Sequence, residues 1–288
     1  MAESEVAAKL GLSRRRPAAL VEAGVLVRLR RGVVVGACVL EQAATEPQLW
    51  HKVQTKALLL AFNDCVASHE SGAVSLDLPV LDLPPYVVGT RERGAWRSTS
   101  EFRVRIAPLP DDHLDCVDSI RTTSKARTVV DVARTSSLQA AFVVGDAALR
   151  RGLSRSELAR VLDNCAGWAD VGKARRALRL LDGRSESPLE SVSRGVFVEN
   201  DFPMSEPQVS IQIDQRTTFR LDFFWEEYGV AGEADGFQKY TSPEVLRAEK
   251  IRQELIERRG IKIVRWTMRE IRFATVPTLA RIEAAFRR

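Results

Sequence analysis

The chain has 288 residues, a length that predicts two domains and allows three. Hydrophobic residues make up 45% and charged residues 28%, the balance of a folded protein, and the net charge of +5 permits a nucleic-acid partner without requiring one. The longest apolar run, near Ala57–Phe62, is far shorter than the roughly 20 residues of a membrane helix, and no secretory signal opens the chain. We therefore expect a cytoplasmic protein with no membrane partner.

Residues 1–45 predict two short helices and a β-hairpin. The first helix is expected over Glu3–Leu10, and Ser13 is a suitable N-cap for a second over Arg14–Ala23, which Gly24 ends. The alternating residues 25–35 then predict a hairpin. Helix, turn, helix and hairpin is the order of a winged helix-turn-helix, a DNA-binding domain.

Arginines gather at the two places where a winged helix contacts DNA. Those at the start of the second helix are placed to reach base edges, and those on the hairpin are placed to bind phosphate: Arg14, Arg15 and Arg16, then Arg28, Arg30 and Arg31. The alternative is a solvated basic face on a small helical hairpin.

Residues 46–182 predict a mixed α/β middle domain. An early helix is expected over Leu49–Phe62, and the β-like segments are Tyr86–Gly89, Phe102–Ile106 and Val117–Thr122. Three helices follow at Lys125–Ala133, Leu138–Arg150 and Arg155–Leu162, the last opened by the capping box Ser154–Glu157. Four scattered cysteines and three scattered histidines predict neither a disulfide framework nor a zinc site.

Residues 183–288 predict a third, α/β domain. Its first helix opens at Ser187-Pro188, and strands follow at Val209–Ile213, Phe219–Trp225 and Val230–Asp235. A long helix then starts at Ser242-Pro243, with an apolar line expected at Val245, Ala248, Ile251 and Leu255. Gly260 ends that helix, Ile261–Trp266 is a further strand, and a capping box at Thr267–Glu270 opens the last helical part.

Acidic residues lie inside the strands of this third domain. Asp222 interrupts an apolar strand, while Glu233 and Asp235 are two apart on the next strand and share a face. If the two strands are neighbours, the three carboxylates can converge. Burying them together is costly, and a divalent cation such as Mg²⁺, which prefers oxygen ligands, removes that cost. A cation held in this way can activate water and stabilise charge on a phosphate.

The same region resembles the very-short-patch-repair-like endonuclease domains of the PD-(D/E)XK nuclease superfamily, over about 100 residues. The stretches that carry the resemblance are Arg220-Leu-Asp-Phe223, Gly232–Gly236, Lys239-Tyr240, Glu249-Lys250 with Arg252, and Val264-Arg-Trp266. The resemblance implies a helical glutamate, at Glu190 or Glu186, and metal ligation by Asp222 and Glu233 with Mg²⁺ or Mn²⁺. It also implies Asp235 and Lys239 as catalytic residues and Lys250 and Arg252 as DNA contacts.

One departure and several alternatives accompany this resemblance. The superfamily's lysine stands two residues after the second acid, where this chain has Asp235, so Lys239 or Lys250 would have to reach the same space. Each acid also has a structural alternative to metal binding. Capping its helix could be the sole role of Glu190, and Asp222 could form an ion pair with Arg252. The segment 233–236 could be an acidic turn at the end of a strand. Lys239 could be a solvated side chain, and residues 249–252 a solvent-facing charged strip.

The preceding regions are similar to antitoxins of the AbiEi type, which belong to abortive-infection systems. The similar stretches are Leu10–Arg15, Val27–Val33, Ser68–Ser71, Thr123–Asp131 and Asp146–Arg151. The similarity implies a toxin partner. It gives no catalytic role to His69 or Arg127, which we interpret as structural.

Together these features predict a mixed α/β (α+β, multidomain) chain: a winged helix-turn-helix (1–45), a mixed α/β AbiEi-like domain (46–182) and a restriction-endonuclease-like domain (183–288). The function expected first is a metal-dependent DNA endonuclease in phage defence or DNA repair. The alternative is a non-catalytic, antitoxin-like transcriptional regulator with a degenerate nuclease fold. DNA is the partner common to both, and a homodimer is left open.

Overall fold

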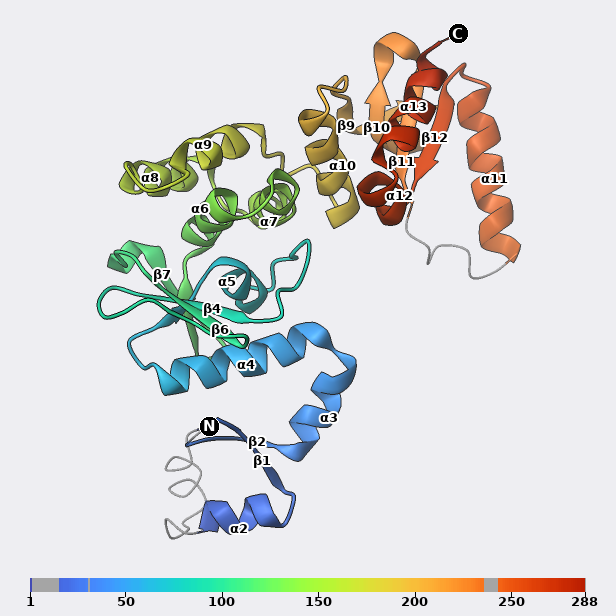
Figure 1. Cartoon of the computed structure of the whole chain (residues 1–288). Helices are drawn as coiled ribbons and strands as arrows, with labels where there is room; N and C mark the ends of the chain where they lie inside the picture. The colour runs from blue at the N-terminus through green and yellow to red at the C-terminus, as the bar shows by residue number, and fades with distance from the viewer. Residues whose placement is uncertain (2–15, 31, 236–242, 288) are drawn as a thin grey trace. The chain divides into compact units, whose positions relative to one another are not determined.

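The computed structural model describes residues 1, 16–30, 32–235 and 243–287 (Figure 1). It confirms a mixed α/β chain and divides into two compact units, each built from two segments. The first unit comprises Met1–Thr135 with Leu153–Arg175, and the second comprises Ser136–Gly152 with Arg176–Arg288. The expected helix Glu3–Leu10 and four expected site residues lie outside the described residues: Arg14, Arg15, Arg31 and Lys239.

The N-terminal part of the first unit contains the expected hairpin. Helix α2 (Arg16–Glu22) precedes the antiparallel strands β1 (Leu26–Arg30) and β2 (Val33–Gly36). Gly24 and Gly32, with φ of 72° and 75°, take the left-handed conformation that glycine adopts without strain at these two turns. Helix α3 (Ala37–Thr45), which the sequence did not predict, follows directly and leads into α4 (Pro47–Ala61).

A six-stranded mixed sheet forms the centre of the first unit, in the order β5-β6-β4-β3-β8-β7. Its strands are β3 (Val66–Ala67), β4 (Val87–Arg91), β5 (Arg97–Ser98), β6 (Phe102–Ile106), β7 (Leu114–Val117) and β8 (Ile120–Thr123). Leu58 and Leu59 of α4 pack against Val87 and Val104 in the apolar core beneath the sheet. Helices α5 (His69–Ser75), α6 (Lys125–Thr135) and α8 (Arg155–Asn164) complete this unit.

One expected strand of this sheet is in fact a hairpin. The segment Val117–Thr122 was predicted to run straight, but β7 ends at Val117 and β8 begins at Ile120. Asp118 and Ser119 have φ of 50° and 62°, the left-handed conformation that a two-residue hairpin turn needs. Because neither residue of this pair is a glycine, the segment was predicted as one continuous β-like piece.

The second unit is centred on a four-stranded sheet in the order β12-β11-β10-β9. The strands are β9 (Glu206–Gln212), β10 (Thr218–Trp225), β11 (Val230–Ala234) and β12 (Lys262–Trp266). The first three pair in an antiparallel manner, and β12 is parallel to β11. Each strand lies where the sequence predicted one.

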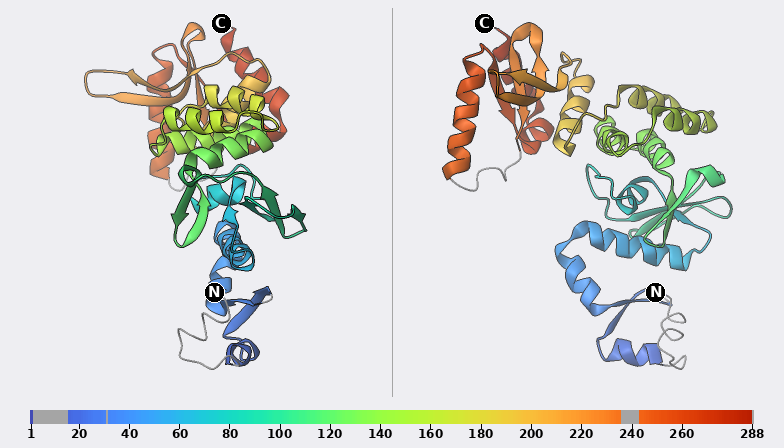
Figure 2. Two further views of the ribbon diagram at one scale, coloured as in Figure 1. Left: turned by 90° about the vertical axis from the view of Figure 1, so that its left-hand side faces the viewer. Right: turned by 180° about the vertical axis from the view of Figure 1, so that it is seen from behind.

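Helices cover both faces of this second sheet. Figure 2 shows α11 (Pro243–Glu257) on one face and α10 (Pro188–Glu199) on the other, with α12 (Met268–Phe273) and α13 (Thr275–Phe286) beside α10. Phe197 of α10 meets Phe223, Trp225 and Trp266 in edge-to-face contacts at 5.6–5.9 Å. Helix α7 (Leu138–Arg150) packs along α10, and α9 (Val171–Leu180) connects the two units.

Helix α11 turns a different face to the sheet than its sequence predicted. Ala248 and Ile251 of the expected apolar line are exposed, whereas Ile256 is fully buried against Leu221. The half-buried positions of the helix include Glu249, Arg252 and Gln253. A polar inward face on a packed helix requires polar partners on the sheet, and these partners form the candidate site.

None of the helices in the described part of the chain is both long and apolar enough to cross a lipid bilayer.

Candidate functional site

Glu190 lies in the first turn of α10, which local sequence chemistry sets in place. Ser187 caps the helix by accepting a hydrogen bond from the Glu190 N–H at 3.2 Å, and Pro188 occupies the first helical position. The Glu190 carboxylate accepts bonds from the Ser187 hydroxyl at 2.8 Å and from the Glu186 N–H at 2.9 Å. The Glu190 side chain is only 4% exposed. It therefore caps its helix and also lies at the edge of the sheet, next to β9.

Gln208 joins Glu190 to Asp222. Its amide nitrogen donates to Glu190 Oε2 at 2.8 Å and lies 3.5 Å from Asp222 Oδ1. The amide oxygen of Gln208 is buried and has no hydrogen-bond partner among the described residues. Gln208 also has a positive φ of 56°, which is strained for a residue with a side chain and is found where the surroundings force it.

Asp222 and Glu233 face each other across neighbouring strands. Phe223 of β10 pairs with Gly232 of β11 in an antiparallel ladder, so Asp222 and Glu233 are the next residues along the two strands. Asp222 Oδ2 accepts a hydrogen bond from the Ala234 N–H at 2.9 Å, which fixes the carboxylate at the end of β11. The expectation that these acids come from adjoining strands is therefore met.

Two arginines hold Glu233. Arg252 of α11 lies 2.5 Å from Glu233 Oε1, and Arg265 of β12 lies 3.1 Å from Oε2. Burial disfavours the charge of Arg252, but the nearby carboxylates of Glu233 and Glu249 raise its pKa above the usual value. The sequence left open an ion pair between Arg252 and Asp222. In the structure, Arg252 pairs with Glu233 instead.

Asp235 and Glu249 extend this network. Arg265 lies 3.7 Å from Asp235 Oδ2, donates to Glu249 Oε1 at 2.6 Å and also donates to Gln253 at 2.8 Å. Asp235 is placed by its own backbone N–H, which donates to the Trp266 carbonyl at 2.9 Å. The carboxylate of Asp235 therefore lies near the Arg265 guanidinium, which also contacts Glu233.

The charges of this cluster do not balance. Five carboxylates (Glu190, Asp222, Glu233, Asp235 and Glu249) accompany two guanidinium groups (Arg252 and Arg265), which leaves an excess of about three negative charges among these residues. Both arginines contact Glu233 and Glu249, and Arg265 also approaches Asp235, whereas Glu190 and Asp222 accept hydrogen bonds from Gln208 and from backbone N–H groups. An excess of negative charge at half-buried groups favours a cation.

Two carboxylates and one amide provide suitable oxygens for such a cation. Glu190 and Asp222 both approach the end of the Gln208 side chain, whose amide oxygen and nitrogen can exchange places by a flip. After that flip, three oxygens from separate elements would converge, and Mg²⁺ typically takes one or two carboxylates and keeps several waters. Within the described residues, no three His, Cys, Asp or Glu side chains group closely enough to hold a metal ion, and Glu233 is engaged by Arg252 and Arg265.

Of the residues expected to bind DNA, some are exposed and others are held in contacts within the protein. Lys250 is exposed on α11, and Arg28 is exposed on β1. Arg30 pairs with Glu101 at 3.3 Å and lies over the ring of Phe102 at 4.8 Å, contacts that attach the hairpin to the edge of the six-stranded sheet. The backbone of Arg16 opens α2, but its side chain lies outside the described residues.

Gln208 and Arg265 are site residues that sequence reasoning missed. Gln208 occupies a position on the predicted solvent-facing side of its strand, as Gln212 does. The alternating pattern therefore gave no reason to assign a functional role to one of them and not the other. Arg265 interrupts the apolar strand β12 as Asp222 interrupts β10. That interruption was a usable signal, because a charge within a buried strand needs a partner.

Comparisons with known proteins found two curated relatives and no matching family model. They are uncharacterized proteins of Mycobacterium tuberculosis, from strains H37Rv and CDC 1551/Oshkosh, each 30% identical over 151 residues. The match covers 52% of this chain and 56% of each relative, so the chain spans about half the length of the curated relatives it matches.

Proposed function

We propose that the protein is a divalent-metal-dependent endonuclease whose site is the carboxylate cluster of the second unit. The observation that carries the proposal is the approach of Glu190 and Asp222, from a helix and a strand, to the single Gln208 side chain with its unpartnered amide oxygen. The elements also carry the motifs of the nuclease resemblance in the expected order, with Glu190 on a helix and Asp222 and Glu233 on neighbouring strands. DNA is the substrate that this resemblance implies.

The chain's own residues would perform three tasks in this reaction. Glu190, Asp222 and Gln208 would hold Mg²⁺ or Mn²⁺, which when bound supplies an activated water and stabilises charge on the phosphate. The two arginines at Glu233 fix its carboxylate beside Asp222 and limit the repulsion between these acids. Lys250, exposed on the neighbouring helix, would contact the DNA backbone.

Plasmid cleavage tests the proposal directly. Purified full-length protein is incubated with supercoiled plasmid in Mg²⁺ or Mn²⁺, together with the variants Asp222→Asn and Glu190→Gln. We expect nicked or linear DNA from the parent and at least about a 10-fold loss of cutting in both variants, since even the loss of a residue that only supports a metal ligand typically costs about 10–100-fold.

Glu186→Gln is the matched control. Glu186 precedes Glu190 by four residues and could fill the same family position, but it is exposed and its carboxylate pairs with Arg220 at 2.6 Å. We expect this variant to cut DNA as the parent does. Cutting that is lost in Glu186→Gln and kept in Glu190→Gln would contradict the assignment, and equal cutting by all proteins would indicate a contaminating nuclease.

A second function is favoured by the ion pairs of Glu233. With Arg252 and Arg265 on this carboxylate, and with Asp235 where the superfamily has lysine, the cluster also suits a DNA-binding regulator of the antitoxin type. A gel-mobility shift by the parent and both acid variants, without cutting in either metal, would support this function over the first. A toxin partner belongs to this second proposal only.

A further inference from the structure

The first unit contains a partly open cavity of about 360 Å³ that the acid cluster does not use. Residues from α5, α6, β6 and the segment before α9 line it, including His69, Arg105, Arg127, Asp131, Arg134 and Trp168. The volume falls within the range of small-molecule sites. Two of the stretches that resemble AbiEi antitoxins, Ser68–Ser71 and Thr123–Asp131, meet at this cavity.

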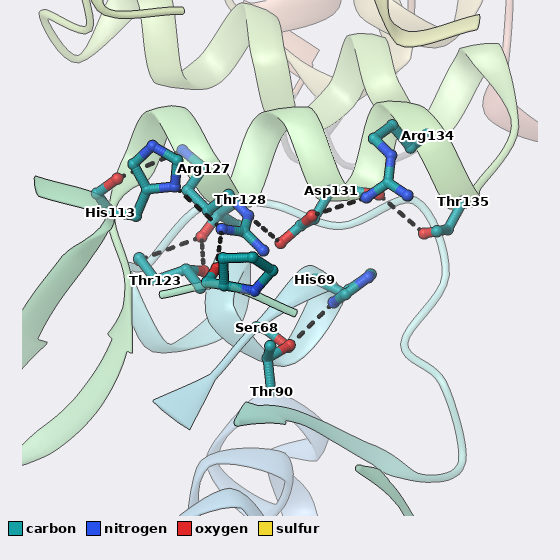
Figure 3. Close-up of polar contacts among 12 residues, drawn as sticks. Ser68, His69, Thr90, His113, Thr123, Arg127, Thr128, Asp131, Arg134 and Thr135 are labelled. Carbon is teal, nitrogen blue, oxygen red and sulfur yellow. Dashed lines mark hydrogen bonds and ion pairs between the residues drawn. The ribbon is translucent and has the colours of Figure 1, made fainter. Parts of the chain in front are cut away.

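The positive charge of the cavity exceeds the negative charge. Asp131 is only 1% exposed and binds two arginines, Arg127 at 2.9 Å and Arg134 at 3.3 Å, so its single charge is shared between them. Figure 3 shows these two guanidinium groups on either side of Asp131. Arg105 provides a third positive charge, and its Nε is buried with no hydrogen-bond partner among the described residues. An unpaired buried donor of this kind is costly unless an anion or other acceptor binds to it.

His69 is held in a strained conformation at the wall of the cavity. Its φ is 55°, a left-handed conformation that is strained for a residue with a side chain. Its Nδ1 lies 3.0 Å from the Ser68 hydroxyl, which in turn accepts a bond from Thr90 at 2.7 Å. Figure 3 shows the other ring nitrogen directed away from Ser68. Burial lowers the pKa of His69, so the ring is neutral near pH 7 and can hydrogen-bond without adding charge.

Two tryptophans supply flat surfaces beside these charges. Trp168 carries the guanidinium groups of Arg127 and Arg134 over its ring, at 4.5 and 4.9 Å. Trp96 also lines the cavity but is 64% exposed, which is unusual for so large an aromatic side chain. An exposed ring next to unpaired arginine suits a ligand that has both a planar apolar part and an anionic part.

We propose that this cavity binds a nucleotide, with its phosphate on Arg105 and Arg134 and its base against Trp96. The ligand is either a free nucleotide or one unit of a single-stranded nucleic acid, since both offer the same phosphate and base. Bases of any sequence stack on an exposed aromatic ring, and guanidinium groups bind phosphate through paired donors. The proposal is independent of the nuclease proposal, because the acid cluster lies in the other unit.

Isothermal titration calorimetry on the full-length protein tests it with three probes: inorganic phosphate, AMP and a six-nucleotide single-stranded DNA. We expect AMP to bind the parent more tightly than phosphate does. Arg105→Gln should weaken both by at least about 10-fold. Trp96→Ala should weaken AMP about 10-fold and leave phosphate unchanged, and because this side chain is exposed, the substitution should not affect folding.

Arg103→Gln is the control on the same strand. Its guanidinium stacks on the ring of Tyr86 at 3.8 Å and does not line the cavity, so AMP affinity should not change. Arg105→Lys, which keeps the charge, should recover part of the affinity that Arg105→Gln loses. DNA bound more tightly than AMP, with the same dependence on Arg105 and Trp96, would identify the strand as the source of the nucleotide.

Three results would overturn the proposal. The first is no heat of binding for any probe at millimolar concentration. The second is an equal loss of affinity in Arg103→Gln and Arg105→Gln, which would point to non-specific charge. The third is phosphate binding as tight as AMP binding and insensitive to Trp96, which would leave an anion site without a base.

Discussion

Three buried histidines of the first unit have pKa values lowered by burial. His51 of α4 is 2% exposed, and its Nε2 lies 2.7 Å from the Ser71 hydroxyl. Burial lowers the pKa of His51 from 6.5 to about 4, and the opposing effect of Glu70 is smaller. His69 and His113 also have pKa values lowered by burial. Each of these histidines is therefore neutral in the folded chain at a pH where the unfolded chain takes up a proton.

The free energy of unfolding of the first unit should therefore fall on acidification, and His51 should account for part of that fall. Its contribution is fully present above pH 6.5, where both states are neutral, and declines as pH falls toward 4, because only the unfolded state then binds the proton. From about pH 7.5 to about pH 5 this loss amounts to about 2 kcal/mol. Urea unfolding at the two pH values should show a smaller loss in His51→Gln than in the parent.

His69 and His113 provide the internal reference for that experiment. Because their side chains remain in His51→Gln, the variant should keep part of the acid sensitivity. An unchanged difference in unfolding free energy between the two pH values would show that His51 does not carry the effect.

At the scale of elements, the packing of the second sheet depends on a glycine of β11 that lies against two tryptophan rings of the neighbouring strands β10 and β12. Gly232 of β11 faces Trp266 and Trp225, and a Cβ at this position would lie 2.4 Å from the Trp266 ring and 3.0 Å from the Trp225 ring. Both tryptophans are buried, and Trp266 is tied by its indole N–H to the Ser193 hydroxyl at 2.7 Å. Position 232, next to Glu233, therefore requires glycine because any side chain there would collide with the tryptophan rings.

Gly232→Ala should destabilise the second unit by about 1–3 kcal/mol, the usual cost of forcing extra volume into a well-packed core. Differential scanning calorimetry should show a lower Tm for this variant. Gly172→Ala is the matched control, since Gly172 is helical and a Cβ there meets nothing within 4 Å. A control variant with the same drop in Tm would argue against the packing explanation.

Element types were predictable from the sequence, but the orientation of α11 was not. Capping boxes at Ser154 and Thr267 and the Ser187-Pro188 start placed α8, α12 and α10 correctly. Strand alternation located β9 and β10. The apolar line predicted for α11 was wrong at Ala248 and Ile251, because the sheet presents the charged groups of Glu233 and Arg265 to the helix, and pairing these charges outweighs burial of Ile251. Leu255 of the same line is half-buried, and the side chain of Val245 lies outside the described residues.

At the scale of the whole molecule, the two compact units do not follow the order of the chain. Helix α7, from the middle of the chain, belongs with α10 of the second unit. Asp146 of α7 is fully buried and pairs with Arg194 of α10 at 2.7 Å, and it also accepts the Asp182 N–H at 2.7 Å. Burial raises the pKa of Asp146, and the arginine opposes that shift. The division into domains 1–45, 46–182 and 183–288 stays a prediction.

Fragments can test which division describes the folding unit. Residues 136–288 keep α7, whereas residues 183–288 lack it, lose the Arg194–Asp146 ion pair and expose the face of α10 that packs against α7. We expect the longer fragment to show a cooperative thermal transition and the shorter one to be partly unfolded by circular dichroism. Equal Tm values for the two fragments would favour a domain boundary near residue 183.

The sequence by itself determined the mixed α/β class, most helices and strands of the second unit, and the acids that the nuclease hypothesis uses. Local rules act over a few residues, so caps, alternation and an acid within an apolar strand can be read directly. Only the tertiary structure decided that Gln208 joins Glu190 to Asp222, that two arginines hold Glu233, and that Arg105, Asp131 and Trp96 line one cavity. These groups come from separate elements, and the partner that satisfies a buried charge depends on which elements pack together.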